Sequence, residues 1–227
     1  MSSIAIGVRD NKAVRFWEST NGKKAVMAVS GLILLLFVLG HMLGNLQFFE
    51  GPEQFNKYSV LLRTLPEALW GVRIVLLIMV ILHIVTAVQL ALQKSRARPI
   101  AYAKRQNTTS SYASRTMYWS GPIVLAFVIY HLLDFTWGTV NPDYVEGDVY
   151  HNVVASFSHP VISLWYIFAM LLLALHLRHG AWSMFQSLGV VHPRHNDLLK
   201  KAAIVFALII FLGFVSIPVS VMTGLVR

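Results

Sequence analysis

The chain has 227 residues, of which 56% are hydrophobic and 13% charged, and its formal net charge is +9. This composition is too apolar for an ordinary soluble domain and indicates a membrane protein. The absence of cysteine excludes disulfides, cysteine-ligated iron–sulfur clusters and covalently attached c-type haem, and the absence of a GxGxxG or Walker-type loop removes the usual nucleotide and flavin sites.

Five apolar runs follow one another along the chain, each bounded by charged residues and each about 20 residues long. A run of that length crosses a bilayer as a helix, because a helix satisfies its own backbone hydrogen bonds. The sequence therefore predicts an all-α integral membrane protein in which residues 1–227 form a single membrane domain. The expected spans are residues 25–43, 74–93, 116–133, 160–177 and 202–226.

The basic residues predict the orientation of these spans. Segments 1–24, 94–115 and 178–201 carry 15 of the 19 lysines and arginines, whereas 7 of the 10 acidic residues lie in the other segments. Because cytoplasmic loops are enriched in Lys and Arg, the N-terminus is expected in the cytoplasm and the C-terminus outside. No AxA-like cleavage site follows the first run, so it is expected to be a retained helix rather than a signal peptide.

Both outer connections are longer than a turn requires. In residues 44–72 apolar side chains recur at helical spacing, which predicts a short helix on the membrane surface from Phe55, Tyr58, Leu61, Leu62 and Leu65. Residues 134–159 are acidic and aromatic. Gly121-Pro122 suits the start of a helix, and Pro218 is expected to kink the last span.

Four of the nine histidines fall inside spans, one in each of the first four: His41, His83, His131 and His176. Ionisable residues are rare in spans and face the interior of a bundle, so a four-helix bundle with a fifth helix beside it is expected. Residue counts from the flanking charges put His41 and His131 near the outer face and His176 near the inner face. His83 is roughly central and joins His176 by elimination. These are called the outer pair (His41, His131) and the inner pair (His83, His176).

Two inward imidazoles at one depth are what six-coordinate b-type haem requires, so each pair is predicted to hold the iron of one haem. A hydrogen bond to a neighbouring helix is the ordinary alternative for a single histidine. Zinc fits less well, because separate histidine pairs lack the further ligands of zinc sites. Small residues near the ligands would let the helices admit a ring: Gly40, Gly44 and Gly180.

His179 lies one turn after His176 and is an alternative ligand. Candidate partners for the haem propionates are Arg178, His179 and Ser183, and an ordinary interfacial position explains these side chains equally well. The remaining histidines are expected to be solvated in loops or at span edges: His151, His159, His192 and His195.

Four segments resemble the membrane-anchor cytochrome b subunit of succinate:quinone oxidoreductase, that is, succinate dehydrogenase or fumarate reductase. They are "GHMLGNLQFFEGPEQFNKYSVLLR", "RIVLLIMVILHIVTAVQLAL" with "ARP" after it, "SGPIVLAFVIYHLLDF" and "LALHLRHGAWSMFQSLG". The similarity covers nearly the whole chain and is to the type in which one five-helix chain holds two haems. It implies that His83 and His176 hold the inner haem and that His41 and His131 hold the outer one.

The resemblance also implies partners and a cellular setting. A flavoprotein subunit and an iron–sulfur subunit of respiratory complex II would pass electrons through this chain to membrane quinone, with menaquinone favoured over ubiquinone. The expected location is the bacterial cytoplasmic membrane. Ala174 stands where some relatives carry a glutamate implicated in proton movement, and no other acidic residue is expected within a span.

Quinone is expected near the outer face. The candidate quinone or proton partners there are Asn45, Gln47, Tyr58, Arg63 and Glu67, with Glu67 the first choice because quinone chemistry moves protons with electrons. Two other functions fit the same spans. One is a di-haem cytochrome b that anchors a hydrogenase or formate dehydrogenase, and the other is a non-redox transporter with hydrogen-bonded histidines.

Overall fold

The computed structural model of the chain describes residues 11–97, 112–141 and 143–227, and over these ranges all regular structure is helical. Most of the basic segment 94–115, which the orientation prediction uses, lies outside the described residues, because these omit 98–111. The elements, in chain order, are α2 (Lys12–Glu18), α3 (Thr20–Leu46), η1 (Gln47–Glu50), α4 (Pro52–Arg63), α5 (Pro66–Arg96), α6 (Tyr112–Phe135), α7 (Val149–Phe157), α8 (Pro160–Ser187), η2 (Pro193–His195) and α9 (Asn196–Met222).

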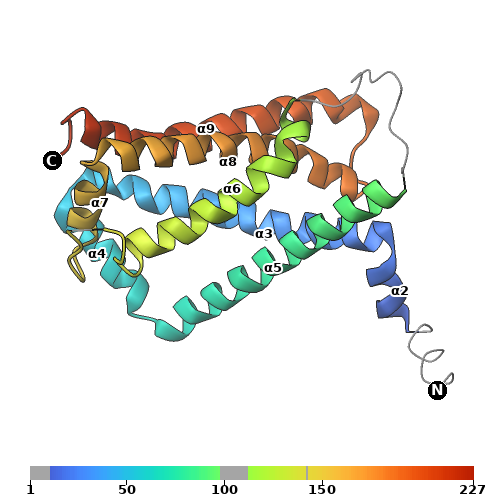
Figure 1. Cartoon of the computed structure of the whole chain (residues 1–227), viewed down its shortest axis with the longest axis horizontal. Coiled ribbons are helices and arrows are strands. Elements are labelled where there is room, and N and C mark those ends of the chain that lie inside the picture. The colour runs from blue at the N-terminus through green and yellow to red at the C-terminus, as the bar shows by residue number, and fades with distance from the viewer. Residues whose placement is uncertain (1–10, 98–111, 142) are drawn as a thin grey trace.

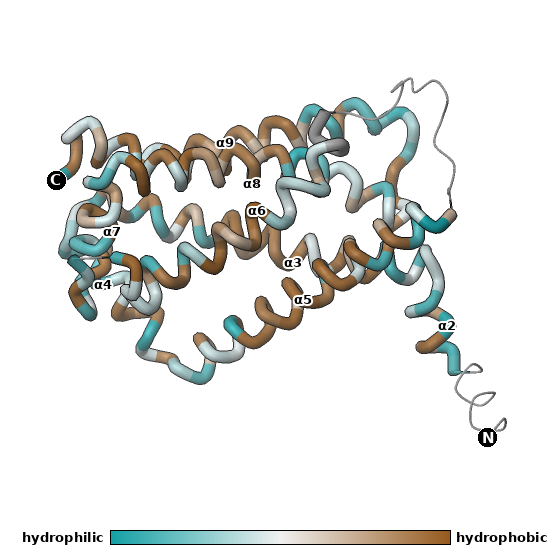
Figure 2. Tube along the Cα trace, in the orientation of Figure 1, coloured by the Kyte–Doolittle hydropathy of each residue, from teal (hydrophilic) through white to brown (hydrophobic). Residues whose placement is uncertain are grey.

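Five of these helices are long and apolar enough to cross a membrane, which confirms the predicted number of spans: α3, α5, α6, α8 and α9. They lie side by side, with hydrophobic residues along their middle and hydrophilic residues concentrated at the two ends of the bundle (Figures 1 and 2). α2 and the C-terminus lie at opposite ends of the bundle, as an odd number of spans requires (Figure 1).

The helices run past most of the predicted ends. α5 begins at Pro66 and α8 continues to Ser187, because charged side chains at the ends of a span reach the interface without ending the helix. Other residues mark the observed helix ends. A proline in the first turn begins both α5 and α8. α9 ends at Met222, four residues before the predicted end, and Gly224 follows it with a φ of 71°.

Two prolines lie within helices. Pro122 is inside α6, which begins at Tyr112, so the prediction that Gly121-Pro122 starts a helix is wrong. Pro218 is inside α9, within the last predicted span.

α4 and α7 lie together at one end of the bundle, called here the cap end (Figure 1). The helix predicted from apolar spacing in residues 44–72 is present as α4, with Phe55 buried and Leu61 and Leu62 exposed. Leu65, which the prediction included, lies beyond the end of α4 and precedes α5. α7 has no counterpart among the predicted elements. It begins after Asp148, whose side chain accepts a hydrogen bond from the backbone N–H of His151 and so caps the helix.

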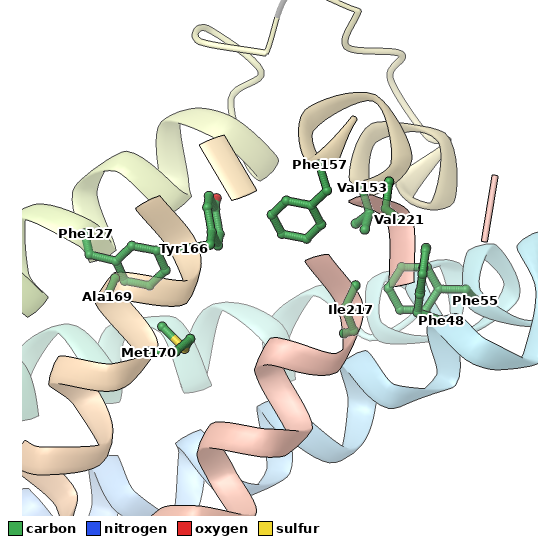
Figure 3. Packing of buried hydrophobic residues seen from close by; sticks show 10 residues of the cluster. All are labelled: Phe48, Phe55, Phe127, Val153, Phe157, Tyr166, Ala169, Met170, Ile217 and Val221. Carbon is green, nitrogen blue, oxygen red and sulfur yellow. The ribbon is translucent and has the colours of Figure 1, made fainter. Parts of the chain in front are cut away.

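The larger apolar core lies beside the cap end and joins η1, α4, α6, α7, α8 and α9 (Figure 3). Tyr166 of α8 is at its centre, with ring centroids 5.0 Å from Phe127 and 4.9 Å from Phe157. A smaller cluster joins α3, α8 and α9 through Met42, Leu177, Ala207 and Ile210. Gly213 lets α9 approach α3, because a Cβ there would overlap the Met42 side chain.

A polar clamp between α4 and α7 is expected to weaken in acid. The backbone N–H of His151 and the side-chain amide of Asn56 donate hydrogen bonds to Asp148, and they lower the pKa of this carboxyl group. Because the folded-state pKa is lowered, the stabilisation is present above the unfolded value of about 4 and is lost as the pH falls through the folded value.

Asn56 also accepts a hydrogen bond from the backbone N–H of Tyr150 at 3.0 Å. N56A should therefore lower the stability of the detergent-solubilised protein by about 1–2 kcal/mol at neutral pH. Thermal unfolding over a pH series should show this difference narrowing below about pH 4 as Asp148 takes up a proton. A constant difference across the series would contradict this account of the clamp.

Candidate functional site

The outer pair lies within the bundle near the cap end. The ring centroids of His41 on α3 and His131 on α6 are 5.8 Å apart, with an interplanar angle of 83°. Aromatic rings surround them: Phe37 stacks on His41 at 5.4 Å, and Tyr166 lies 6.1 Å from His131. The structure thus brings together two side chains separated by 90 residues in the sequence.

The inner pair is formed by His83 on α5 and His176 on α8, with ring centroids 6.2 Å apart. Nδ1 of His83 lies 3.4 Å from the hydroxyl oxygen of Ser30 on α3. A Cβ at Gly31 would lie 3.2 Å from Cε1 of His83, so glycine at this position lets the imidazole lie against α3. A hydrogen-bond partner on Nδ1 would fix the ring and leave Nε2 available for a ligand.

The two pairs occupy separate levels of the bundle. Ser30 marks the level of the inner pair, and His41 is eleven residues further along the same helix. At 1.5 Å per residue this separation is about 16 Å along the axis. The depths assigned from the sequence put His41 with His131 and His83 with His176, and the structure brings the same partners together.

The helices that supply each pair are not packed neighbours. α3 packs along α5, α8 and α9, and α6 packs along α8, but neither α3 with α6 nor α5 with α8 forms an extended backbone packing. Each imidazole pair therefore spans the bundle diagonally. Helices that face one another without close backbone contact are what a planar ligand held between two imidazoles requires.

Each pair contains one buried imidazole nitrogen without a hydrogen-bond partner among the described residues. These are Nδ1 of His131 and Nδ1 of His176. The ring centroids are 5.8 Å apart in the outer pair and 6.2 Å apart in the inner pair, and imidazoles at this separation would hold one metal ion through nitrogen. Within the described ranges, no three His, Cys, Asp or Glu side chains gather as a metal-ion site.

His176 of the inner pair and the propionate candidates share the last turns of α8. His176, not His179, has its ring in contact with His83, so the geometry favours His176 as the partner of His83. Nδ1 of His179 is buried without a partner in the described chain, and its ring lies 6.4 Å from Trp182. Arg178 is exposed, and the Ser183 hydroxyl donates to the Gly180 carbonyl at 3.3 Å.

The five quinone candidates do not form one cluster. Asn45 is nearest to the outer pair, with Nδ2 3.3 Å from Nε2 of His41. Gly44 is expected from the sequence to give clearance to a haem ring, but a Cβ there would meet the Tyr58 hydroxyl, so Gly44 makes room for α4. Gln47 begins η1, whereas Arg63 and Glu67 are exposed near the link between α4 and α5.

The other glycines and histidines have simpler surroundings. Gly40 and Gly180 have nothing within 4 Å of a Cβ position. The four histidines expected to be solvated are exposed, which confirms that prediction: His151, His159, His192 and His195.

One buried acid escapes prediction from the sequence. Asp134 marks the outer boundary of the third predicted span, and no acidic residue is expected inside a span. The structure corrects this, because Asp134 lies inside α6 and is fully buried. The hydroxyls of Ser156 and Tyr166 both donate to its Oδ2, at 2.8 and 2.7 Å. Its spacing of three residues from His131 is the available signal, since residues at i and i+3 share a helix face.

Comparison with known proteins identifies a family. Residues 93–216, more than half of the chain, match the family described as the succinate dehydrogenase/fumarate reductase transmembrane subunit. The match includes His131 and His176, whereas His41 and His83 precede it. No curated protein and no solved structure matches the chain. With its five membrane-length helices, the chain belongs to the family of succinate dehydrogenase/fumarate reductase transmembrane subunits.

Proposed function

We propose that this membrane subunit is a di-haem cytochrome b that passes electrons between the iron–sulfur subunit and membrane quinone. The observation that carries the proposal is the pair of diagonal imidazole contacts, His41 with His131 and His83 with His176, at two levels of one bundle. Two redox groups at these levels would divide the thickness of the membrane into short electron-transfer steps.

Each proposed residue has a specific task. The four histidines would supply the axial nitrogens, and b-type haem would supply one-electron redox chemistry at each level. Ser30 would fix the ring orientation of His83 through Nδ1 and leave its Nε2 for the iron. Asn45 lies against Nε2 of His41, so a haem bound through that nitrogen would replace this contact. Arg178, His179 and Ser183 stay candidates for the propionates.

The quinone is proposed to bind near the cap end, with menaquinone favoured. Glu67 keeps its proposed role as a proton partner, since an exposed carboxylate in the first turn of α5 has access to water. Asn45 and Tyr58 are the candidates nearest to the outer pair and α3.

The proposed partners are the flavoprotein and iron–sulfur subunits of the same complex. They would dock at the end of the bundle opposite the cap end, which the positive-inside rule places in the cytoplasm of a bacterium. Basic side chains gather on the described segments there: Lys12, Arg15, Lys24, Lys94, Arg96, Arg178, Arg194, Lys200 and Lys201. The family match disfavours the hydrogenase or formate dehydrogenase anchor and the transporter.

Affinity purification of the tagged chain from its native membrane tests the proposal. We expect it to bring down a flavoprotein and an iron–sulfur protein, and pyridine-haemochrome analysis should give two b-type haems per chain. A complex with both partners and no haem would refute the di-haem assignment alone. Haem without either partner would favour an anchor for another oxidoreductase.

A further inference from the structure

Asp134 is the acidic residue that is buried within the described part of this bundle. It is fully buried near the end of α6, inside one of the five membrane-length helices. The only ion pair that the described residues form is Lys200 with Asp197, so none of the described cations pairs with Asp134. A buried carboxylate without a cation is costly, and such groups inside membranes are generally retained for function.

The hydrogen bonds of Asp134 are divided unequally between its two oxygens. Oδ2 accepts from the hydroxyls of Ser156 on α7 and Tyr166 on α8. Oδ1 is buried and has no partner within the described residues. This arrangement holds the carboxyl group rigidly through one oxygen and leaves the other as a place where a proton can be taken up.

Asp134 is also close to the outer pair. It follows His131 by three residues on one helix, which separates the two Cβ atoms by about 5–6 Å. Tyr166, which donates to Asp134, has its ring 6.1 Å from that of His131. The titratable groups facing this region are Tyr130 and His131 on α6, Tyr166 on α8 and His41 on α3, while α7 contributes the non-titrating Ser156.

We propose that Asp134 couples proton uptake to the redox state of the outer pair's centre. Asp134 takes up one proton at Oδ1 from the aqueous side of the cap end when one electron, supplied by quinol or by the iron–sulfur partner, arrives at that centre. It releases the proton when the electron leaves. One added negative charge is balanced by one added proton, so the buried region keeps its net charge through the cycle.

This inference rests on the proposed function, and a separate experiment tests it. Redox titration of the purified complex at several pH values should give a midpoint potential for the outer haem that falls as the pH rises. At most this is a tenfold change in the reduction equilibrium per pH unit, or about 59 mV for one electron. D134N should flatten this dependence, and E146Q, which removes an exposed charge from the same end, should keep it.

A second measurement reads Asp134 directly. The reduced-minus-oxidised infrared spectrum should contain a carboxylic C=O band that is absent in D134N. If D134N does not assemble, S156A and Y166F keep the carboxyl group and each remove one hydrogen bond to Oδ2, so both should move the pH range of the dependence.

The outcomes separate the two proposals. A complex without haem refutes the proposed function. A complex with two haems whose outer potential has the same pH dependence in wild type and D134N refutes the role of Asp134 and leaves the proposed function intact. If S156A and Y166F are used instead, an unchanged pH range for the midpoint potential of the outer haem likewise refutes the role of Asp134.

Discussion

H131A should remove one of the two haems from the purified complex and leave the other in place. Under the proposed function His131 supplies one axial nitrogen of the outer centre, and alanine has no atom that can replace it. H41A should lose the same haem. H83A and H176A should lose the other, because their rings form the second pair. Low-temperature visible spectra and haem quantitation measure which band disappears.

The retained haem serves as the internal control for folding in each variant. H159A is a matched control, since His159 is exposed and its side chain does not cap α8, and it should keep both haems. H179A should also keep both haems, and this result would show that His176 rather than His179 is the ligand. If H41A and H83A lost the same haem, the pairing would be wrong.

F48A should destabilise the solubilised protein by about 3–5 kcal/mol, the range for removing a large buried aromatic ring. Phe48 is only 1% exposed and joins three elements at the cap end. Its ring stacks on Tyr150 of α7 at 4.8 Å and meets Phe55 of α4 edge-on at 5.8 Å. Alanine would leave a cavity at the point where η1, α4 and α7 meet.

Phe49 provides the matched control, because it is the next residue, has the same side chain and is 45% exposed. F49A should change the stability by well under half as much as F48A, as expected for a largely exposed side chain. Thermal unfolding in one detergent, followed by circular dichroism, compares the two. Equal losses would show that the cap end is not held by Phe48.

Much of the bundle could be predicted because lipid imposes strict rules on the chain. A run of about 20 apolar residues must be helical, so the five spans and the interior position of His41, His83, His131 and His176 follow from the sequence. The depth of each histidine could be counted because the rise of a helix is constant.

The helix ends and the buried acid could not be found this way. Boundaries drawn at the first charge assume that a charge leaves the membrane. Asp134 does not, because Ser156 and Tyr166 donate hydrogen bonds to one of its oxygens inside the protein. Those donors come from α7 and α8, and their approach depends on tertiary packing. α7 escapes prediction for a related reason, since nine residues are too few for a clear periodic pattern.

The diagonal arrangement has a consequence for the attachment of α5. α5 packs along α3 and touches α4, but only 6% of the residues in its most apolar stretch are buried, so the protein alone holds it on one side. Under the proposed function, the inner haem, held between His83 and His176, would be the second attachment of α5. A chain without this haem would therefore hold α5 only through its packing on α3 and its contact with α4.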